Sequence, residues 1–243
     1  MHNKNKLSKP TTLHKCLSFF AFNKEGTIDD VATFIGKNYS TALRVIKKLL
    51  NVDFIKLDRT ERTSVKGKEK KIYRIMLHGL FAFTLINREL VALKFEEMVE
   101  VQKDKLLTFR KWEYFKKKGL EKIVETRFFS SLRKWFVGRQ LTFLMVTETF
   151  EKPTFPKLVT DENTARAADT DILGITSIVD PPNHTRQHMG EQKWGELMKL
   201  FKAIEEDYEL RMFKQDQLFW IENGYKERLK SIDQWKELLK NLT

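Results

Sequence analysis

Ser40, Thr41 and Arg44 are spaced so that three hydrogen-bonding side chains lie on one turn of a helix. The guanidinium of Arg44 is planar and can donate two parallel hydrogen bonds, the pattern that guanine accepts in the major groove of DNA. Lys47 and Lys48 follow, and their ammonium groups act as point charges that suit phosphate. We therefore predict that the first three residues reach base edges and that the two lysines contact phosphates. The alternative is a helix face that only solvent covers.

A helix must present these side chains, and the apolar residues among them have helical spacing. The apolar residues of Ser40–Leu50 that share one face are Ala42, Val45, Ile46 and Leu49. Burial of this stripe leaves the polar residues pointing outward. The turn before this helix adds Lys37 and Tyr39 to the predicted contacts. Tyr39 either donates a hydrogen bond to a phosphate or packs the preceding helix against this one.

Two helices are predicted before this one and two strands after it. Apolar spacing indicates helices over Thr11–Phe22 and Asp29–Ile35, separated by the short extended Thr27-Ile28. Alternating residues then indicate strands over Phe54–Arg59 and Lys70–Met76. The charged loop between the strands contains the remaining predicted contacts with a nucleic-acid backbone, namely Arg62, Lys66 and Lys68. The alternative for this loop is a charged hairpin with no ligand.

The positive charge of the chain is concentrated in this N-terminal part. Met1–His78 has 17 Lys and Arg against 7 Asp and Glu, whereas Gly79–Thr243 has 28 against 26. A surface of one sign attracts a polyanion by releasing its condensed counterions. The regional excess therefore favours a nucleic acid as the partner.

The same residues resemble prokaryotic winged-helix transcription regulators, particularly archaeal ones. The resemblance rests on the Ser-x-x-x-Arg-x-x-x-x-Leu pattern of Ser40–Leu49, on Phe54-Ile55 and on Tyr73–Leu80, and it covers about one third of the chain. It implies that the third helix enters the major groove and that the strand pair places its loop against phosphates or the minor groove. Asp53 is a departure, because the family usually has a glycine there.

The region after the strands is predicted to be mostly helical. Gly79–Val101 has the pattern of one helix that packs on the first helix. Lys103–Gln140 has 12 basic against 4 acidic residues, interleaved with eight aromatic ones. We expect these rings to be core and the lysines to be solvated, because eight large rings are too many to expose. The alternative is a second surface for DNA or for stacked single-stranded bases.

The C-terminal part divides into a loop region and a helical hairpin. Residues 151–193 contain four of the five prolines and little periodicity, which predicts an extended loop region with short elements. Residues 194–242 have apolar residues at alternating intervals of three and four, with Gly224 as the predicted break between two helices. The apolar face of these predicted helices must pack against a partner, either another part of the same chain or a second subunit.

Few residues suggest catalysis or a metal site. Cys16 is the single cysteine, which excludes an internal disulfide and a cysteine-rich zinc site. His184, His188 and Glu191 have a spacing that could hold a metal ion, but the preceding prolines favour a polar first helical turn. No phosphate-binding loop, dinucleotide fingerprint or nucleophile elbow occurs in the sequence. We therefore expect no enzyme activity and no cofactor.

Together these observations predict a mainly α protein with a small β-wing. A winged helix-turn-helix domain is expected over residues 8–78, followed by a mostly helical dimerisation or effector region over 79–243. The predicted function is sequence-selective binding of double-stranded DNA in transcriptional regulation, by a cytoplasmic, nucleoid-associated homodimer. No apolar run reaches the roughly 20 residues that span a membrane. The alternatives are a winged-helix protein-interaction module, a replication initiator or other mobile-element DNA-binding protein, and, with least support, a metal-dependent nucleic-acid enzyme.

Overall fold

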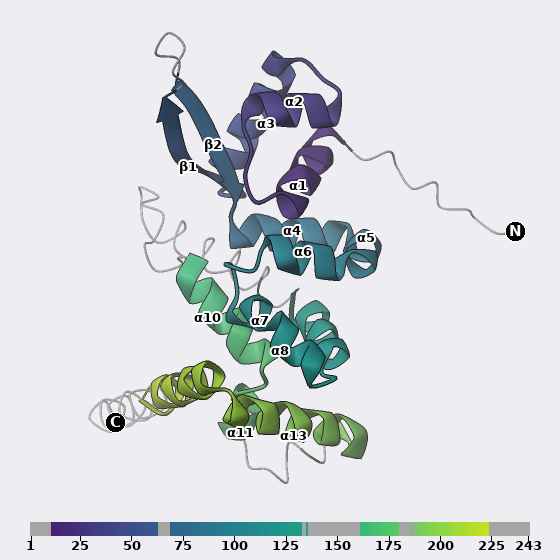
Figure 1. Cartoon of the computed structure of the whole chain (residues 1–243), viewed down its shortest axis with the longest axis vertical. Helices are drawn as coiled ribbons and strands as arrows, with labels where there is room; N and C mark the ends of the chain where they lie inside the picture. Colours follow the sequence, from purple (N-terminus) through teal and green to yellow (C-terminus); the bar gives the residue numbers. More distant parts are fainter. Residues whose placement is uncertain are drawn as a thin grey trace, which may run out of the picture. The chain divides into compact units, whose positions relative to one another are not determined.

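The described elements are helices apart from one antiparallel pair of strands (Figure 1). This computed structural model describes residues 11–62, 69–132, 135, 161–179, 186 and 189–223. It consists of two units, one built from Met1–Arg110 with Ser130–Arg166 and the other from Lys111–Phe129 with Ala167–Thr243. The predicted class, mainly α with a small β element, is confirmed.

The first unit begins with α1 (Thr12–Phe22), α2 (Ile28–Ile35) and α3 (Tyr39–Asn51), as the sequence predicted to within one residue at each end. Local hydrogen bonds explain where the helices begin. The side chains of Thr11 and Asn38 accept hydrogen bonds from backbone N–H groups at the starts of α1 and α3. Thr27 and Asp30 cap α2 reciprocally, and these hydrogen bonds hold the pKa of Asp30 below its usual value.

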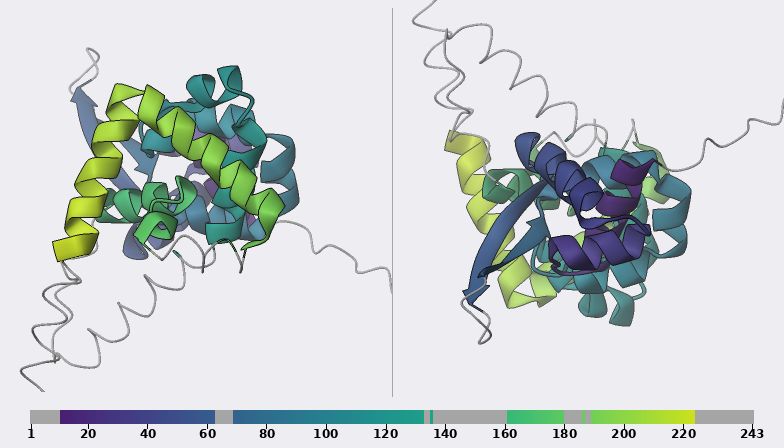
Figure 2. Two further views of the ribbon diagram at one scale, coloured as in Figure 1. Left: turned by 90° about the horizontal axis from the view of Figure 1, so that it is seen from below. Right: turned by 90° about the horizontal axis from the view of Figure 1, so that it is seen from above.

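The strands β1 (Ile55–Arg62) and β2 (Glu69–Ile75) follow α3 and pair from Ile55 opposite Ile75 to Arg62 opposite Glu69. Gly26, between α1 and α2, joins β2 through hydrogen bonds in both directions with Tyr73. A Cβ at position 26 would lie 2.4 Å from the Phe19 ring, so any other residue there would require that ring to shift. This bridge fastens the strand pair beside the three helices, an arrangement visible from above in Figure 2.

Three further helices follow the strands: α4 (Leu77–Ile86), α5 (Arg88–Leu93) and α6 (Phe95–Val101). α4 and α6 contact α1, as predicted for this region. The prediction of a single helix over 79–101 is wrong, because the backbone leaves helical geometry at Asn87 and Lys94. At the end of α4 the Phe83 carbonyl accepts hydrogen bonds from both the backbone N–H and the side-chain amide of Asn87.

The first unit also contains the short helix α7 (Leu107–Arg110) and the first part of α10 (Asp161–Ile172). α7 follows α6, and α10 begins in this unit and continues into the other. An Asp161 carboxylate oxygen accepts the backbone N–H of Leu77 at the start of α4, 3.1 Å away. The prediction of a loop over 151–193 is wrong for α10. The helix was missed because small residues such as Ala168 and Thr170 form its buried face.

The second unit contains α8 (Trp112–Lys117), α11 (Thr176–Val179), α13 (Glu191–Glu206) and helical residues 121–129 and 208–223. The Tyr114 hydroxyl donates to the carbonyl of Ala203 at 2.7 Å, which joins α8 to α13. The predicted C-terminal helix does not run on to Gly224, because it ends at Asp207. The Asp207 carboxylate accepts the N–H of Leu210 and starts a new helix there. Among the described residues, no helix has the length and apolarity to cross a membrane.

Candidate nucleic-acid interface

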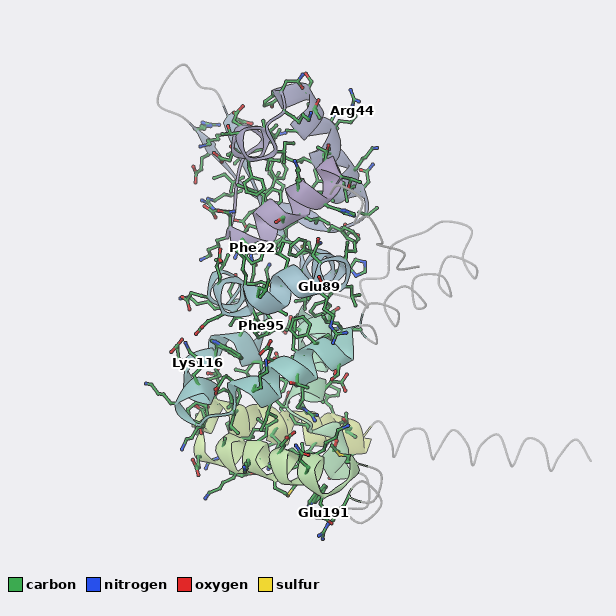
Figure 3. The ribbon with its side chains drawn as sticks, turned by 90° about the vertical axis from the view of Figure 1, so that its right-hand side faces the viewer. Phe22, Arg44, Glu89, Phe95, Lys116 and Glu191 are labelled. Atoms are coloured by element: carbon green, nitrogen blue, oxygen red, sulfur yellow. The ribbon has the colours of Figure 1, made fainter. Side chains whose placement is uncertain are left out.

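α3 presents a polar face to solvent, opposite its buried stripe. Ser40, Arg44, Lys47 and Lys48 are exposed and Thr41 is partly exposed. The stripe of Ala42, Val45, Ile46 and Leu49 is at most 8% exposed, as the sequence predicted. Figure 3 shows Arg44 extending away from the ribbon at the edge of the first unit. α3 thus holds the predicted contact residues on a surface that a ligand can reach.

The cations on and just before α3 have no carboxylate partners among the described residues. Within the described part of the chain, no ion pair involves Lys37, Arg44, Lys47 or Lys48. Nearby arginines differ, since Arg59 pairs with Glu25 at 2.6 Å and Arg74 pairs with Asp58 and Asp104. The α3 cations can therefore bind an external anion without first breaking an internal ion pair.

A groove of about 810 Å³ lies between α3 and β2, with the start of α2 at its side. We call it the α3–β2 groove. Lys47 lines it from α3, and Lys70 and Lys71 line it from β2. Asp29 and Glu69 also line it, so the groove has three cations and two carboxylates. Its apolar floor includes Leu43, Ile46 and Leu50. The groove therefore joins the charged face of α3 to the strand pair as one basic surface.

The α3–β2 groove contains two tyrosines. Tyr39 is 49% exposed and lines the groove together with Tyr73. Burial, followed by the proximity of Tyr39, raises the pKa of Tyr73 above its usual value. The Tyr73 hydroxyl therefore remains protonated at neutral pH and can act as a hydrogen-bond donor. Tyr39 thus lines the groove while half of its surface faces solvent, and its two predicted roles stay predictions.

Three residues of this surface were not predicted from the sequence. The sequence predicts Lys70 and Lys71 only as strand residues, and it predicts a third helix that ends before Asn51. Asn51 ends α3 on the exposed face, seven positions after Arg44 and four after Lys47. The period of the polar residues along the helix could have identified it. Lys70 and Lys71 had no such signal, because strand pairing and packing decided their position.

The outer part of the strand pair contains the other predicted contacts. Arg62 is exposed and lies opposite Glu69 in the sheet, which places a carboxylate beside it. Lys66 and Lys68 fall outside the described residues. Glu25, which pairs with Arg59, has its pKa lowered by that hydrogen bond. Together with the Gly26 bridge, this ion pair fixes the base of the sheet to the segment that precedes α2.

Asp53 adopts the left-handed backbone conformation that glycine adopts easily, with φ of 53°. The N–H groups of Asp53 and Phe54 donate to the carbonyls of Leu50 and Leu49 and close the end of α3. Aspartate is tolerated in this region better than most residues. The turn between α3 and β1 is therefore tight although position 53 is an aspartate and not a glycine.

The second basic segment, Lys103–Gln140, has a different character. Its described aromatic residues are buried except for the partly exposed Tyr114, and Phe136 lies outside the described residues. Lys111 pairs with Asp207 at 2.9 Å and with Glu209 at 3.1 Å, and Lys118 pairs with Glu206 at 2.5 Å. The Arg127 guanidinium donates to the carbonyls of Asp171 and Ile172. The prediction that the aromatic residues form core is confirmed for the described ones.

Among its described residues, the structure brings together no group of three or more His, Cys, Asp or Glu side chains that could hold a metal ion. His184 and His188 lie outside those residues, and Glu191 forms an ion pair with Arg186 at 2.8 Å. Burial raises the pKa of the Cys16 thiol to about 12, so this group is an unreactive core thiol at neutral pH. Among the described residues, the exposed α3 face with its groove is thus the strongest candidate site. No protein-family model, curated protein or solved structure matches the chain.

Proposed function

We propose that the N-terminal part of this chain is a winged helix-turn-helix that binds double-stranded DNA with sequence selectivity and thereby regulates transcription. The observation that carries the proposal is the face of α3, where Arg44, Lys47 and Lys48 are exposed and have no ion-pair partner in the described residues. Counterion release makes such a surface bind a polyanion. The apolar stripe behind it gives the helix the rigidity needed to read base edges.

α3 enters the major groove in this proposal, with Arg44 as the base-reading residue and Ser40 and Thr41 beside it. A bidentate contact from an arginine to guanine contributes about 1–3 kcal/mol of discrimination. Lys47 and Lys48 contact phosphates and fix the position of the helix. Lys37 and Tyr39 contact the backbone at the start of α3.

The α3–β2 groove holds one strand of the DNA backbone in the same proposal. Lys47 contacts phosphates from one wall and Lys70 and Lys71 from the other, since all three line the groove. Asp29 and Glu69 also line it and repel phosphate, which limits where along the groove the backbone can lie. Arg62, Lys66 and Lys68 extend this contact along the wing.

The protein acts as a homodimer through its helical region in this proposal, in the cytoplasm at the nucleoid. Two copies related by a two-fold axis place their α3 helices in successive major grooves, about 34 Å apart. The DNA site is then an inverted repeat. An effector that binds the helical region would change the separation of the two α3 helices.

Binding of selected and random duplexes by two variants tests this proposal. A site is first enriched from a random duplex pool, and affinities are then measured by fluorescence anisotropy at several salt concentrations. We expect Arg44→Ala to lose about 1–3 kcal/mol on the selected site and much less on random duplex. Lys47→Ala should weaken both alike and reduce the salt slope by about one. Lys94→Ala is the control, because Lys94 is exposed in the same unit but pairs with Glu97.

The outcomes separate this proposal from its alternatives. A steep salt dependence with no other protein present supports DNA binding, whereas the absence of affinity at low salt overturns it and favours a protein-interaction module. Equal losses for Arg44→Ala on selected and random duplex would remove the base-reading role of Arg44.

A further inference from the structure

Helical residues 208–223 of the second unit present an apolar stripe to solvent. On the side facing the unit, Leu210 is fully buried and Gln217 is 9% exposed. On the opposite side, Tyr208, Met212 and Phe219 are 70%, 45% and 62% exposed, and Gln215 lies between them. We call these four residues the seam. Large apolar side chains at such exposure on one side of a helix indicate a protein contact.

The spacing along the seam is that of a two-stranded coiled coil. The residues follow one another at intervals of four, three and four, and this alternation keeps a stripe facing a second helix along its length. Met212 and Phe219 then occupy one core position of the repeat, and Tyr208 and Gln215 the other. A polar Gln215 in the middle of the seam suits pairing with an identical residue, since each amide can donate to and accept from the other.

The flanking charges favour a second copy of this chain, aligned in parallel. In a parallel pair, the residue just before a core position faces the residue five positions later on the partner helix. Arg211 would then face the partner's Asp216, and symmetry makes this attraction occur twice. An antiparallel pair would instead place Asp216 beside the partner's Glu209, which is acidic and already pairs with Lys111, so this alignment adds no attraction.

We propose that the seam is a homodimer interface in which residues 208–223 of two copies pair as a parallel coiled coil. This surface is the one that the dimer in the proposed function requires. Glu222 occupies the next core position, three residues after Phe219, and is exposed. Its carboxylate would lie beside the partner's Glu222 and oppose pairing. The dimer is therefore held by the apolar residues and by the Arg211–Asp216 pairs, and it is weakened at this end.

The solution mass of the full chain without DNA tests the interface. Multi-angle light scattering over a dilution series should give a dimer for the wild type and a single chain for Phe219→Glu. Met198→Glu is the matched control, because Met198 is 36% exposed on α13 and is not part of the seam, so this variant should remain a dimer. Both residues are exposed, so neither change should unfold the chain.

Charge variants test the parallel alignment. Arg211→Asp should raise the dissociation constant of the dimer about tenfold, and the addition of Asp216→Arg should restore it, because the pair is then reversed rather than lost. Glu222→Gln should tighten the dimer. A wild-type mass of one chain, an intact dimer in Phe219→Glu, or the absence of rescue by Asp216→Arg would each overturn the proposal. These measurements contain no DNA. A failure of the dimer interface therefore does not decide whether α3 binds a single half-site, which the DNA-binding experiment tests separately.

Discussion

The chain has two basic regions, the surface of α3 with β2 and the segment Lys103–Gln140, and their cations have different surroundings. Arg44, Lys47 and Lys48 have no ion-pair partner in the described residues. In the second region, Lys111 and Lys118 pair with acidic residues at the end of α13. Other lysines of that region pair with a glutamate one helical turn away, as Lys116 does with Glu113.

A count of basic residues in the sequence therefore does not identify a surface that binds an anion. A cation that already has a carboxylate partner must lose that partner before it binds phosphate, which cancels much of the gain. An unpaired, exposed cation loses only part of its hydration. The distribution of carboxylates around the lysines therefore separates the two regions, although both have a strong positive excess in the sequence.

Removal of three charges from each region should have very different effects on DNA affinity. Replacement of Arg44, Lys47 and Lys48 together by alanine should weaken binding about a hundredfold to a thousandfold, since each contact contributes roughly tenfold at about 0.1 M salt. The matched set is Lys103, Lys116 and Lys122, each paired with a glutamate three positions away. Its replacement should change affinity less than about threefold. Equal losses would mean that the second region also binds DNA, as in a replication initiator.

Asp207→Asn should reduce stability at neutral pH and leave DNA affinity unchanged. Burial opposes ionisation of Asp207, but hydrogen bonds from Leu210 and Lys111 hold its folded pKa below the usual value. Its contribution is therefore present above the unfolded pKa and is lost as pH falls through the folded pKa. Urea unfolding at about pH 7 should show a loss of about 1–2 kcal/mol, and this difference should shrink as the pH falls below the unfolded pKa. A difference that persists in acid would contradict a role for the ionised carboxylate.

Asp53→Gly should have the smallest effect, a stabilisation of about 0.5 kcal/mol. Asp53 has positive φ, and glycine relieves that conformation while it increases the entropy of the unfolded chain. Val52→Gly is the control, because Val52 has φ of −108° and the same substitution there only adds chain entropy. Thermal unfolding should raise the Tm of the first variant and lower that of the second. A lower Tm for Asp53→Gly would show that the aspartate side chain stabilises this turn.

Apolar periodicity was sufficient to predict the first three helices and both strands. Each of these helices begins at a capping side chain adjacent to its apolar stripe, so that local sequence determines both its face and its start. Periodicity failed for 79–101, where α4 is buried on all sides from Leu77 to Thr84 and has no polar face to mark its period. It also failed for α10, whose buried face is built from small and polar residues.

The sequence by itself determined which face of α3 is polar, because the spacing of apolar residues in a helix allows one buried side. It did not determine which lysines are available to a ligand. Lys70 and Lys71 lie beside Lys47 only because β2 packs against α3. Lys111 is not available to a ligand because it pairs with Asp207, a residue 96 positions away. Ion pairs form between groups that are close in space. A pair between residues far apart in the sequence, such as Lys111 and Asp207, therefore cannot be inferred from their positions along the chain. Tertiary structure alone decided where the positive charge remains free.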